Sequence, residues 1–289
     1  MNYVILTDSA CDLSYDLKGL PDLDFIPMGY LQGGEPYSHM PFADSRAVKE
    51  FYSRQREGIL AKTSQITSFK YEAVMRSWLD KGCSVLYLAL SGGLSSTYQT
   101  ASLTGIKLQN QYPGLRVIVI DTKAATGGMG ILTERALRNR MAGMDIHENA
   151  MDLENAVLHL HHWFLVDDLA YLQRGGRISM AAAAVGTLFH VHPILQIDTG
   201  GKLKVIGKAR GNHKAVRELT EHYEKYRTED MNDPVYVVDG DAPETGDLIE
   251  KKLSKNHPGL IIRRCTLSPI IGAHTGPGLA AIIHIGTLS

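Results

Sequence analysis

The feature that most constrains the fold is a short apolar run followed by a polar turn, which recurs along the first half of the chain. Three such runs are Tyr3–Leu6, Val85–Leu90 and Val117–Ile120. None contains a charged residue, which is typical of strands buried on both faces of a parallel sheet. Helical spacing over Ala47–Arg56 and Phe69–Leu79 lies between the first two runs. This alternation predicts an α/β fold, with a parallel sheet and helices on both of its faces.

The second half of the sequence shows a different pattern of predicted elements. Pro193–Ile197 and Lys202–Ile206 flank the turn 198–201 and predict an antiparallel hairpin. A hairpin mixed with helices is typical of an α+β domain, so we expect an N-terminal α/β domain over residues 1–160 and a C-terminal α+β domain over residues 161–289. The other expected elements are strands over Phe25–Tyr30, Trp163–Val166, Val235–Val238, Leu260–Cys265 and Leu279–Ile285, a turn at Gly33-Gly34, and helices over Glu148–Leu160, Lys214–Tyr226 and Thr245–Leu253 and from the glycine-rich stretch 126–130 to about Met141.

Composition and charge limit the classes of function. A chain of 289 residues with 44% hydrophobic residues can bury a core without disulfides or metals. The formal net charge of −1 argues against nucleic acid as a principal partner, because that binding depends on clustered basic charge. The three cysteines suit a reducing compartment. An acid at Asp8 comes too early for a signal peptide, and no apolar run reaches about 18 residues, so we expect a cytoplasmic protein.

The stretch Ser91–Thr100 is a candidate binding site. It follows an apolar run and joins a glycine turn to a hydroxyl-rich segment that can begin a helix, where Ser96 and Gln99 fit a capping box. Free backbone N–H groups and the helix dipole favour an anion at such a position. Because the stretch has no lysine or arginine, a carboxylate suits it better than a polyphosphate. The alternative is an ordinary turn between a strand and a well-capped helix.

Two other polar turns share this character, Thr63–Ser68 and His274–Gly278. Each taken alone is more typical of a turn or a helix cap than of a site. Together with Ser91–Thr100 they offer hydroxyls, an imidazole and backbone N–H groups to one acidic head group. Such neutral donors can hold a carboxylate without a large positive field.

Several signatures of enzymes and metal sites are incomplete. Residues 93–97 lack the last glycine of a nucleophile elbow, Thr133 replaces the third glycine of a dinucleotide fingerprint, and the sequence has no phosphate-binding loop. Histidines lie close together at 159–162 and at His190 and His192, but no matching cysteine or carboxylate pattern accompanies them. A structural role for these histidines is therefore favoured over a metal site.

Six motifs in a fixed order resemble those of the DegV family and span essentially the whole chain. They are Thr7-Asp8-Ser9 with Asp12-Leu13, Thr63-Ser64-Gln65, Gly93-Leu94-Ser95 with Thr97-Tyr98-Gln99, Gly175-Gly176-Arg177-Ile178, Lys208-Ala209-Arg210-Gly211 and His274-Thr275-Gly276-Pro277-Gly278. The resemblance implies a two-domain α/β fold with a long-chain fatty acid in an apolar tunnel. Characterised members of this family are the fatty acid-binding subunit (FakB) of bacterial fatty acid kinase, whose separate ATP-binding subunit (FakA) phosphorylates the carboxylate. By this resemblance the chain is a lipid-binding subunit without catalysis or a cofactor of its own.

The resemblance also implies roles for single residues. Thr63 and Ser95 would hydrogen-bond the carboxylate, with His274 beside it. Arg177 and Arg210 would lie nearer the face that meets the kinase subunit. The loop residues near the carboxylate would be Ser64, Gly93, Ser96 and Thr97. The sequence departs from the family pattern at Gly92, Ser96 and Ile66, and these changes leave the expected ligand residues in place.

Two other functions stay open from the residues. One is a stand-alone enzyme that uses Ser95 or His274 on a lipid-like acid, although the incomplete enzyme signatures argue against it. The other is a carrier of a different apolar acid that has no kinase partner.

Overall fold

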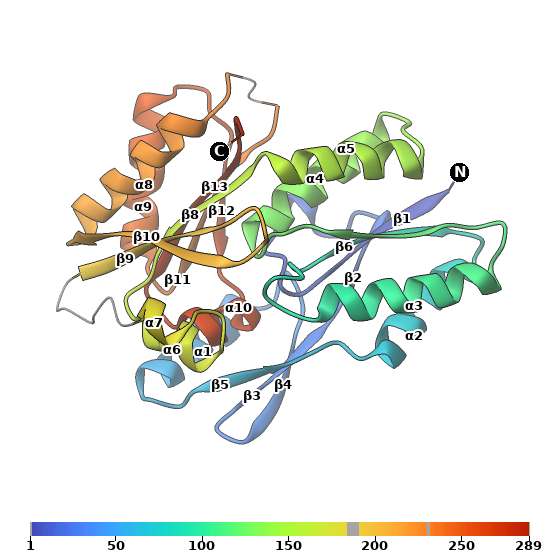
Figure 1. Ribbon diagram of the computed structural model, residues 1–289, viewed down its shortest axis with the longest axis horizontal. Coiled ribbons are helices and arrows are strands. Elements are labelled where there is room, and N and C mark those ends of the chain that lie inside the picture. The colour runs from blue at the N-terminus through green and yellow to red at the C-terminus, as the bar shows by residue number, and fades with distance from the viewer. Residues whose placement is uncertain (1, 184–190, 230–231, 289) are drawn as a thin grey trace.

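A computed structural model describes residues 2–183, 191–229 and 232–288, whose strands form three sheets (Figure 1). The first is a parallel sheet with the order β2-β1-β6-β7. Its strands are β1 (Tyr3–Asp8), β2 (Leu23–Ile26), β6 (Ser84–Ala89) and β7 (Val117–Asp121). Every residue of β1 and β6 is buried, as their continuous apolar runs predict. The predicted parallel sheet is confirmed.

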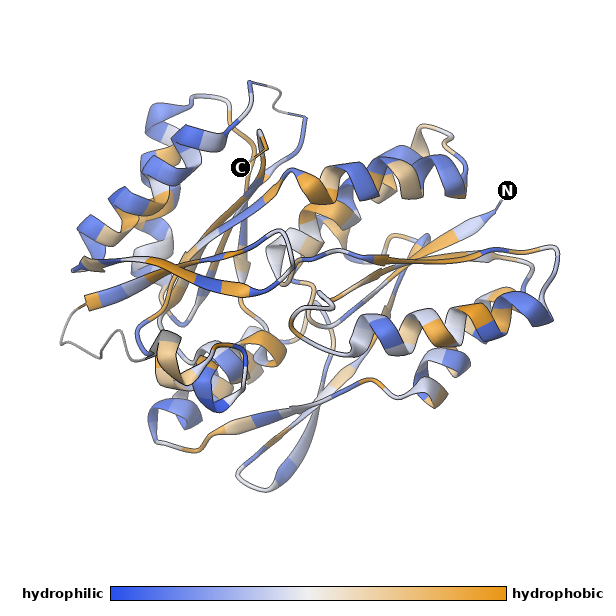
Figure 2. Ribbon diagram, in the orientation of Figure 1, coloured by the Kyte–Doolittle hydropathy of each residue, from blue (hydrophilic) through white to orange (hydrophobic). Residues whose placement is uncertain are grey.

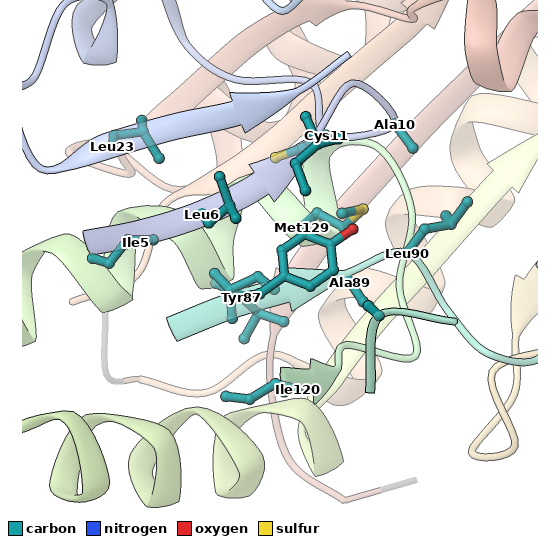
Figure 3. Close-up of a cluster of buried hydrophobic side chains, with 14 of the residues drawn as sticks. Ile5, Leu6, Ala10, Cys11, Leu23, Tyr87, Ala89, Leu90, Ile120 and Met129 are labelled. Carbon is teal, nitrogen blue, oxygen red and sulfur yellow. The ribbon is translucent and has the colours of Figure 1, made fainter. Parts of the chain in front are cut away.

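Helices cover both faces of this parallel sheet. Figure 1 shows α2 (Ser68–Leu79) and α3 (Thr97–Gln111) on one side and α4 (Gly127–Met141) and α5 (Ile146–Leu158) on the other. The core around this sheet includes Leu6, Tyr87 and Met129, which are all fully buried (Figure 3). Tyr87 packs against Tyr71 of α2, whereas Met129 belongs to α4. The helix expected over Glu148–Leu160 ends at Leu158, because Leu160 already begins the next strand.

The second sheet is six-stranded and mixed, with the order β10-β9-β8-β13-β11-β12. Its strands are β8 (Leu160–Leu165), β9 (Val191–Ile197), β10 (Leu203–Arg210), β11 (Val235–Gly240), β12 (Ile262–Thr266) and β13 (Leu279–Ile285). The expected hairpin is β9–β10, and only the β11–β12 pair among these is parallel. Helices α8 (Asn212–Tyr226) and α9 (Pro243–Asn256) pack on one face, with their hydrophilic residues turned outward (Figure 2).

The third sheet corrects two expectations. The strand expected over Phe25–Tyr30 is two strands, because Pro27 has no N–H for a ladder and separates β2 from β3 (Met28–Gln32). A turn at Gly33-Gly34 joins β3 to β4 (Glu35–His39), as expected, and β5 (Ala61–Ser64) pairs with the other edge of β3. Thr63 therefore lies at the end of an antiparallel strand rather than in a turn. The elements around it are antiparallel, so the site is not built from parallel strands alone.

Helix α10 (Pro269–Thr275) corrects the third polar turn, since His274 and Thr275 form its last turn. Although α10 comes late in the sequence, it contacts α1 (Ser45–Arg56), β3 and β5, and its Ile270 and Ala273 belong to the core of the first half. The remaining short helices are the 3-10 turn Tyr15–Leu17, α6 (Leu169–Arg174) and α7 (Met180–Ala183). A domain boundary near residue 160 stays a prediction. Within the described part of the chain, no helix combines the length and apolarity needed to cross a bilayer.

Candidate functional site: an amphipathic cavity

A cavity of about 700 Å³ lies where the six-stranded sheet meets β5, α6, α10 and the loop that follows β6. This volume falls within the usual range for small-molecule sites. The six-stranded sheet supplies an apolar wall of Phe164, Ile197, Leu203, Leu279, Ala281 and Ile283. Side chains on a strand alternate between faces, so Leu279, Ala281 and Ile283 face the cavity while Ala280 and Ile282 belong to the core beneath α8 and α9.

Most of the site residues predicted from the sequence line this one cavity. They are Thr63, Ser64, Gly93, Ser95, Ser96, Arg177 and His274. Thr97 is buried and contacts Ser95 from behind, with 2.8 Å between their hydroxyl oxygens. Arg210 is exposed at the end of β10 and does not line the cavity. The structure thus brings together residues from four separate segments and leaves Arg210 apart.

His274 and Thr63 meet across the two halves of the chain. The Nε2 atom of His274 lies 2.8 Å from Oγ1 of Thr63. Burial, and next the nearby Arg177, lowers the pKa of His274 from 6.5 to about 4. The imidazole is therefore neutral at pH 7. It acts as a hydrogen-bonding group rather than as a cation, in agreement with the neutral donor set that the sequence predicts.

Arg177 is placed by the way α6 ends. Gly176 adopts a positive φ of 73°, and the N–H groups of Gly176 and Arg177 donate to the carbonyls of Gln173 and Leu172. This is the Schellman motif, for which glycine is the usual residue because it has no Cβ. The turn directs Arg177 back toward the loop after β6, where its Nε donates to the Leu94 carbonyl at 3.1 Å. The guanidinium thus lies beside the hydroxyl loop.

The loop after β6 is held by its own hydroxyls and by β7. The Gly92 N–H donates to the Asp121 carboxylate at 2.9 Å, and Ser91 Oγ donates to the Gly201 carbonyl at 2.7 Å. A Cβ on Gly93 would lie 2.5 Å from that same carbonyl oxygen, so only glycine lets the loop approach the β9–β10 hairpin this closely. The loop therefore joins the parallel sheet to the six-stranded sheet.

The predicted capping box is wrong. Ser96 is the residue before α3, but its side chain makes no capping hydrogen bond. Instead Ser95 Oγ accepts from the Thr97 N–H at 3.3 Å, so the cap shifts by one residue. Gln99 is exposed and has no reciprocal role.

Sequence reasoning missed several cavity residues, among them His162, Tyr171 and Arg174. His162 lines the cavity from β8, and burial lowers its pKa to about 3. Tyr171 and Arg174 line it from α6, with the guanidinium carbon of Arg174 4.6 Å from the centre of the Tyr171 ring. Tyr171 and Arg174 are three positions apart, a spacing that places both side chains on one face of a helix. This spacing could have indicated from the sequence that they act together. His162 was noted only as a member of a histidine-rich stretch.

Metal-ligating side chains do not gather in the described ranges. Across residues 2–183, 191–229 and 232–288, no three His, Cys, Asp or Glu side chains are grouped as a metal site would require. His190 lies outside these ranges. The polar side chains that line the cavity are hydroxyls, imidazoles and guanidinium groups, with the amide of Gln65 and the amine of Lys62.

Known proteins share this chain's sequence pattern and its fold. Residues 2–286 match the sequence model described as "Uncharacterised protein, DegV family". A DegV domain-containing protein of Clostridium perfringens is 33% identical over 285 residues, which cover 98% of this chain and 97% of that protein.

Solved structures of DegV family and fatty acid-binding proteins share the fold of this chain. A fatty acid-binding DegV family protein from Thermus thermophilus is 28% identical, covers 99% of this chain and 100% of its own, and has a TM-score of 0.84. The Streptococcus pneumoniae fatty acid kinase B3 protein, solved with linoleic acid, shares the fold at 17% identity, with a TM-score of 0.86 and 99% of each chain covered. The parallel N-terminal sheet and the mixed C-terminal sheet are the DegV fold, and this chain belongs to the DegV family.

Proposed function

We propose that this protein binds a long-chain fatty acid in the cavity and presents the carboxylate to a separate ATP-binding fatty acid kinase subunit (FakA-like). The observation that carries the proposal is the division of one cavity into an apolar sheet wall and a group of hydroxyl, imidazole and guanidinium side chains. An acid with a long hydrocarbon chain has the same division. Fatty acid binding by the Thermus relative, which has the same fold, supports the proposal.

The apolar wall supplies most of the proposed affinity. Each methylene group that leaves water contributes about 0.8 kcal/mol, so a long chain gains far more from the wall than a short one. The wall residues on β8, β9, β10 and β13 carry no charge, with His162 as the polar member. His162 is neutral because of its lowered pKa. The chemistry of the wall therefore favours an unbranched hydrocarbon over a polar ligand.

The carboxylate would bind where Thr63, Ser95 and His274 line the cavity. A neutral imidazole 2.8 Å from Thr63 can orient that hydroxyl toward an anion. Arg177 donates to the Leu94 carbonyl of the same loop, and its proposed role lies in the transfer step below rather than in holding the carboxylate. Gly93 and Ser96 in the loop after β6, Thr97 at the start of α3 and Ser64 at the end of β5 would surround this position, and no catalytic role is proposed for any of these residues.

The kinase partner is proposed for a chemical reason. Converting a carboxylate to an acyl phosphate adds negative charge, which a guanidinium can meet with two hydrogen bonds. Arg177 at the cavity and the exposed Arg210 offer such groups. The fold shared with the pneumococcal fatty acid kinase B3 protein supports this partner. With neither a phosphate-binding loop nor an activated nucleophile in its motifs, the protein is proposed to turn over neither ATP nor acyl esters by itself.

Native mass spectrometry of the purified protein tests the ligand, and a co-purified long-chain fatty acid is the expected result. Thr63→Ala and Ser95→Ala should each weaken the affinity for stearic acid by about tenfold to a hundredfold, because each removes a hydrogen bond to a charged group. Ser77→Ala is the matched control, since Ser77 on α2 is exposed and its hydroxyl donates only to Val74.

Two outcomes would contradict the proposal. Unchanged affinity in both Thr63→Ala and Ser95→Ala would remove these hydroxyls from the site. Hydrolysis of an acyl ester by the highly purified protein, lost in Ser95→Ala, would favour the stand-alone enzyme instead.

A further inference from the structure

Asp12 joins two walls of the cavity although it does not line the cavity itself. It follows β1 and is 7% exposed. Its carboxylate accepts from the Ser268 N–H, at 3.1 Å to Oδ1 and 3.2 Å to Oδ2, and from the Thr126 hydroxyl. Ser268 immediately precedes α10, and Thr126 immediately precedes α4. One side chain therefore links β1 to the first residues of two helices.

The Thr126 partner is held in a strained conformation. Its φ is 50° and its ψ is −130°, values that a β-branched residue rarely adopts. The Thr126 N–H donates to the Ala10 carbonyl at 2.8 Å, so both polar groups of Thr126 bond to the segment that contains Asp12. Thr126 and its neighbour Ala125 line the cavity. Surrounding bonds of this kind keep a strained residue in place.

The Ser268 partner fixes the start of the helix that carries His274. His274 lies six positions after Ser268, which corresponds to about 9 Å along a helix. The first half of the chain also holds α10 through Tyr52, whose hydroxyl donates to the Leu267 carbonyl at 3.0 Å, and through Gln55, which donates to the Gly272 carbonyl at 3.2 Å. Asp12 differs from these two residues because it also accepts a hydrogen bond from Thr126, which lines the cavity at the start of α4.

We propose that Asp12 is a positioning residue of the cavity, which fixes α10 and the Thr126 corner relative to one another and so sets the place of His274. The consequence for fatty acid affinity rests on the proposed function, whereas the effect on His274 does not. The role is not that of a ligand, since Asp12 touches neither the cavity nor His274.

The electrostatic surroundings agree with this role. Burial raises the pKa of Asp12 to about 7. The ionisable side chains that act on Asp12 are Cys11, Tyr52 and Cys265, and burial raises the pKa of each, so all three are uncharged at neutral pH. Figure 3 shows Cys11 in the buried cluster beside β1. The carboxylate therefore depends on its three hydrogen bonds alone, and protonation would turn one of its oxygens from an acceptor into a donor.

The test compares Asp12→Ala with Asp12→Asn, whose amide oxygen can still accept from the Ser268 N–H. Asp12→Ala should raise the Kd for stearic acid at least tenfold and shift the ¹⁵N resonances of the His274 ring in the ligand-free protein. Asp12→Asn should recover most of both properties. On lowering the pH from 8 to 6, the His274 signals should move in the native protein and stay fixed in Asp12→Asn, since burial keeps His274 itself neutral over this range.

Thr126→Val tests the same link from its other end without removing a buried charge. It should give a smaller shift of the His274 signals in the same direction. A lower thermal midpoint with unchanged His274 resonances and unchanged affinity in Asp12→Ala and Thr126→Val would overturn the proposal and leave Asp12 a structural residue. If the native protein binds no stearic acid, the proposed function fails, and the resonances of His274 alone still decide the role of Asp12.

Discussion

The parallel sheet and the six-stranded sheet contribute to the cavity in opposite ways. The parallel sheet is covered by helices on both faces. In the described part of the chain it reaches the cavity through the loops at the carboxyl ends of its strands, with Leu90 and Gly92–Ser96 after β6 and Ala125 and Thr126 after β7. The six-stranded sheet has helices α8 and α9 on one face and gives part of its other face to the cavity. Loops thus supply polar groups, whereas a sheet face supplies apolar area.

This difference separates orientation of a ligand from its affinity. Carboxyl ends of parallel strands are the usual place for ligand-binding groups in α/β folds, and here they bring Ser95 and the loop glycines. A sheet face offers a continuous apolar surface whose size is set by strand length. The two parts can therefore change independently, and the following experiments test that independence.

The largest effect is expected from filling the space in front of the sheet wall. Ala281 lies on β13 between Leu279 and Ile283, which all line the cavity. Ala281→Phe should displace about four methylene groups of the ligand, which costs about 3 kcal/mol, or more than a hundredfold in affinity for stearic acid. Decanoic acid, titrated in parallel, should lose much less. Equal losses for both acids would mean that the wall does not contact the hydrocarbon chain.

Lowering the pH should change the stability contributed by the six-stranded sheet and by the first half of the chain in opposite directions. The pKa values of His162 on β8 and His284 on β13 are both lowered by burial to about 3. A lowered pKa means that the stability from the neutral form is complete above the unfolded value of 6.5 and is lost as the pH falls toward 3. Each group then costs about 2 kcal/mol at pH 5.

Asp12, in the first half, has a raised pKa of about 7 against 3.8 for the free side chain, so its contribution to stability is lost as the pH rises between these values. The midpoint of urea unfolding should therefore fall from pH 7 to pH 5. Compared with the native protein, this decrease between pH 7 and pH 5 should be smaller in His284→Gln and larger in Asp12→Asn. The same slope in both variants would contradict this assignment.

A tenfold effect is expected for the two arginines, on rate rather than on binding. Arg177→Ala and Arg210→Ala should keep the stearic acid affinity within about twofold but slow acyl-phosphate formation with the kinase subunit by tenfold, a barrier increase of about 1.4 kcal/mol. Lysine at either position should restore only part of the rate, because it lacks the planar guanidinium. Since only Arg177 lines the cavity, an equal loss of affinity and rate in Arg177→Ala alone would make it a ligand residue.

The smallest effect is expected at Gln99. Because the capping box is absent and Gln99 is exposed, Gln99→Ala should change the free energy of unfolding by less than about 0.5 kcal/mol. Thermal unfolding measures it directly. A loss near 1 kcal/mol would indicate that Gln99 caps α3 after all.

The parallel sheet was predictable because β1, β6 and β7 are short, uninterrupted apolar runs, and such runs are typical of buried strands. β5 was not predictable, since Ala61–Ser64 has neither an apolar run nor alternation and forms a strand only by pairing with β3. α10 is seven residues long, too short for periodicity, although Pro269 at its start and Gly276-Pro277 after it were usable signals.

The candidate site was predictable only as a set of residue types. The hydroxyl turns and His274 could be named from the sequence, but the contact between Thr63 and His274 spans 211 positions. Arg177 reaches the loop after β6 only because the Schellman turn reverses the chain at Gly176. The apolar wall could not be predicted from the sequence. Because Leu279–Ile285 is apolar at nearly every position, its pattern does not show which face of the strand lines a cavity.

The late position of α10 in the sequence has a consequence for synthesis of the protein. The ribosome releases the first half of the chain with Thr63 and the loop after β6 already present, but without the imidazole that completes them. During that interval the gap for α10 between α1 and β5 exposes Phe51 and Tyr52, which are buried in the finished molecule. Such an intermediate exposes apolar surface and is prone to association. A nascent chain therefore gains its complete site only after α10 has been synthesised.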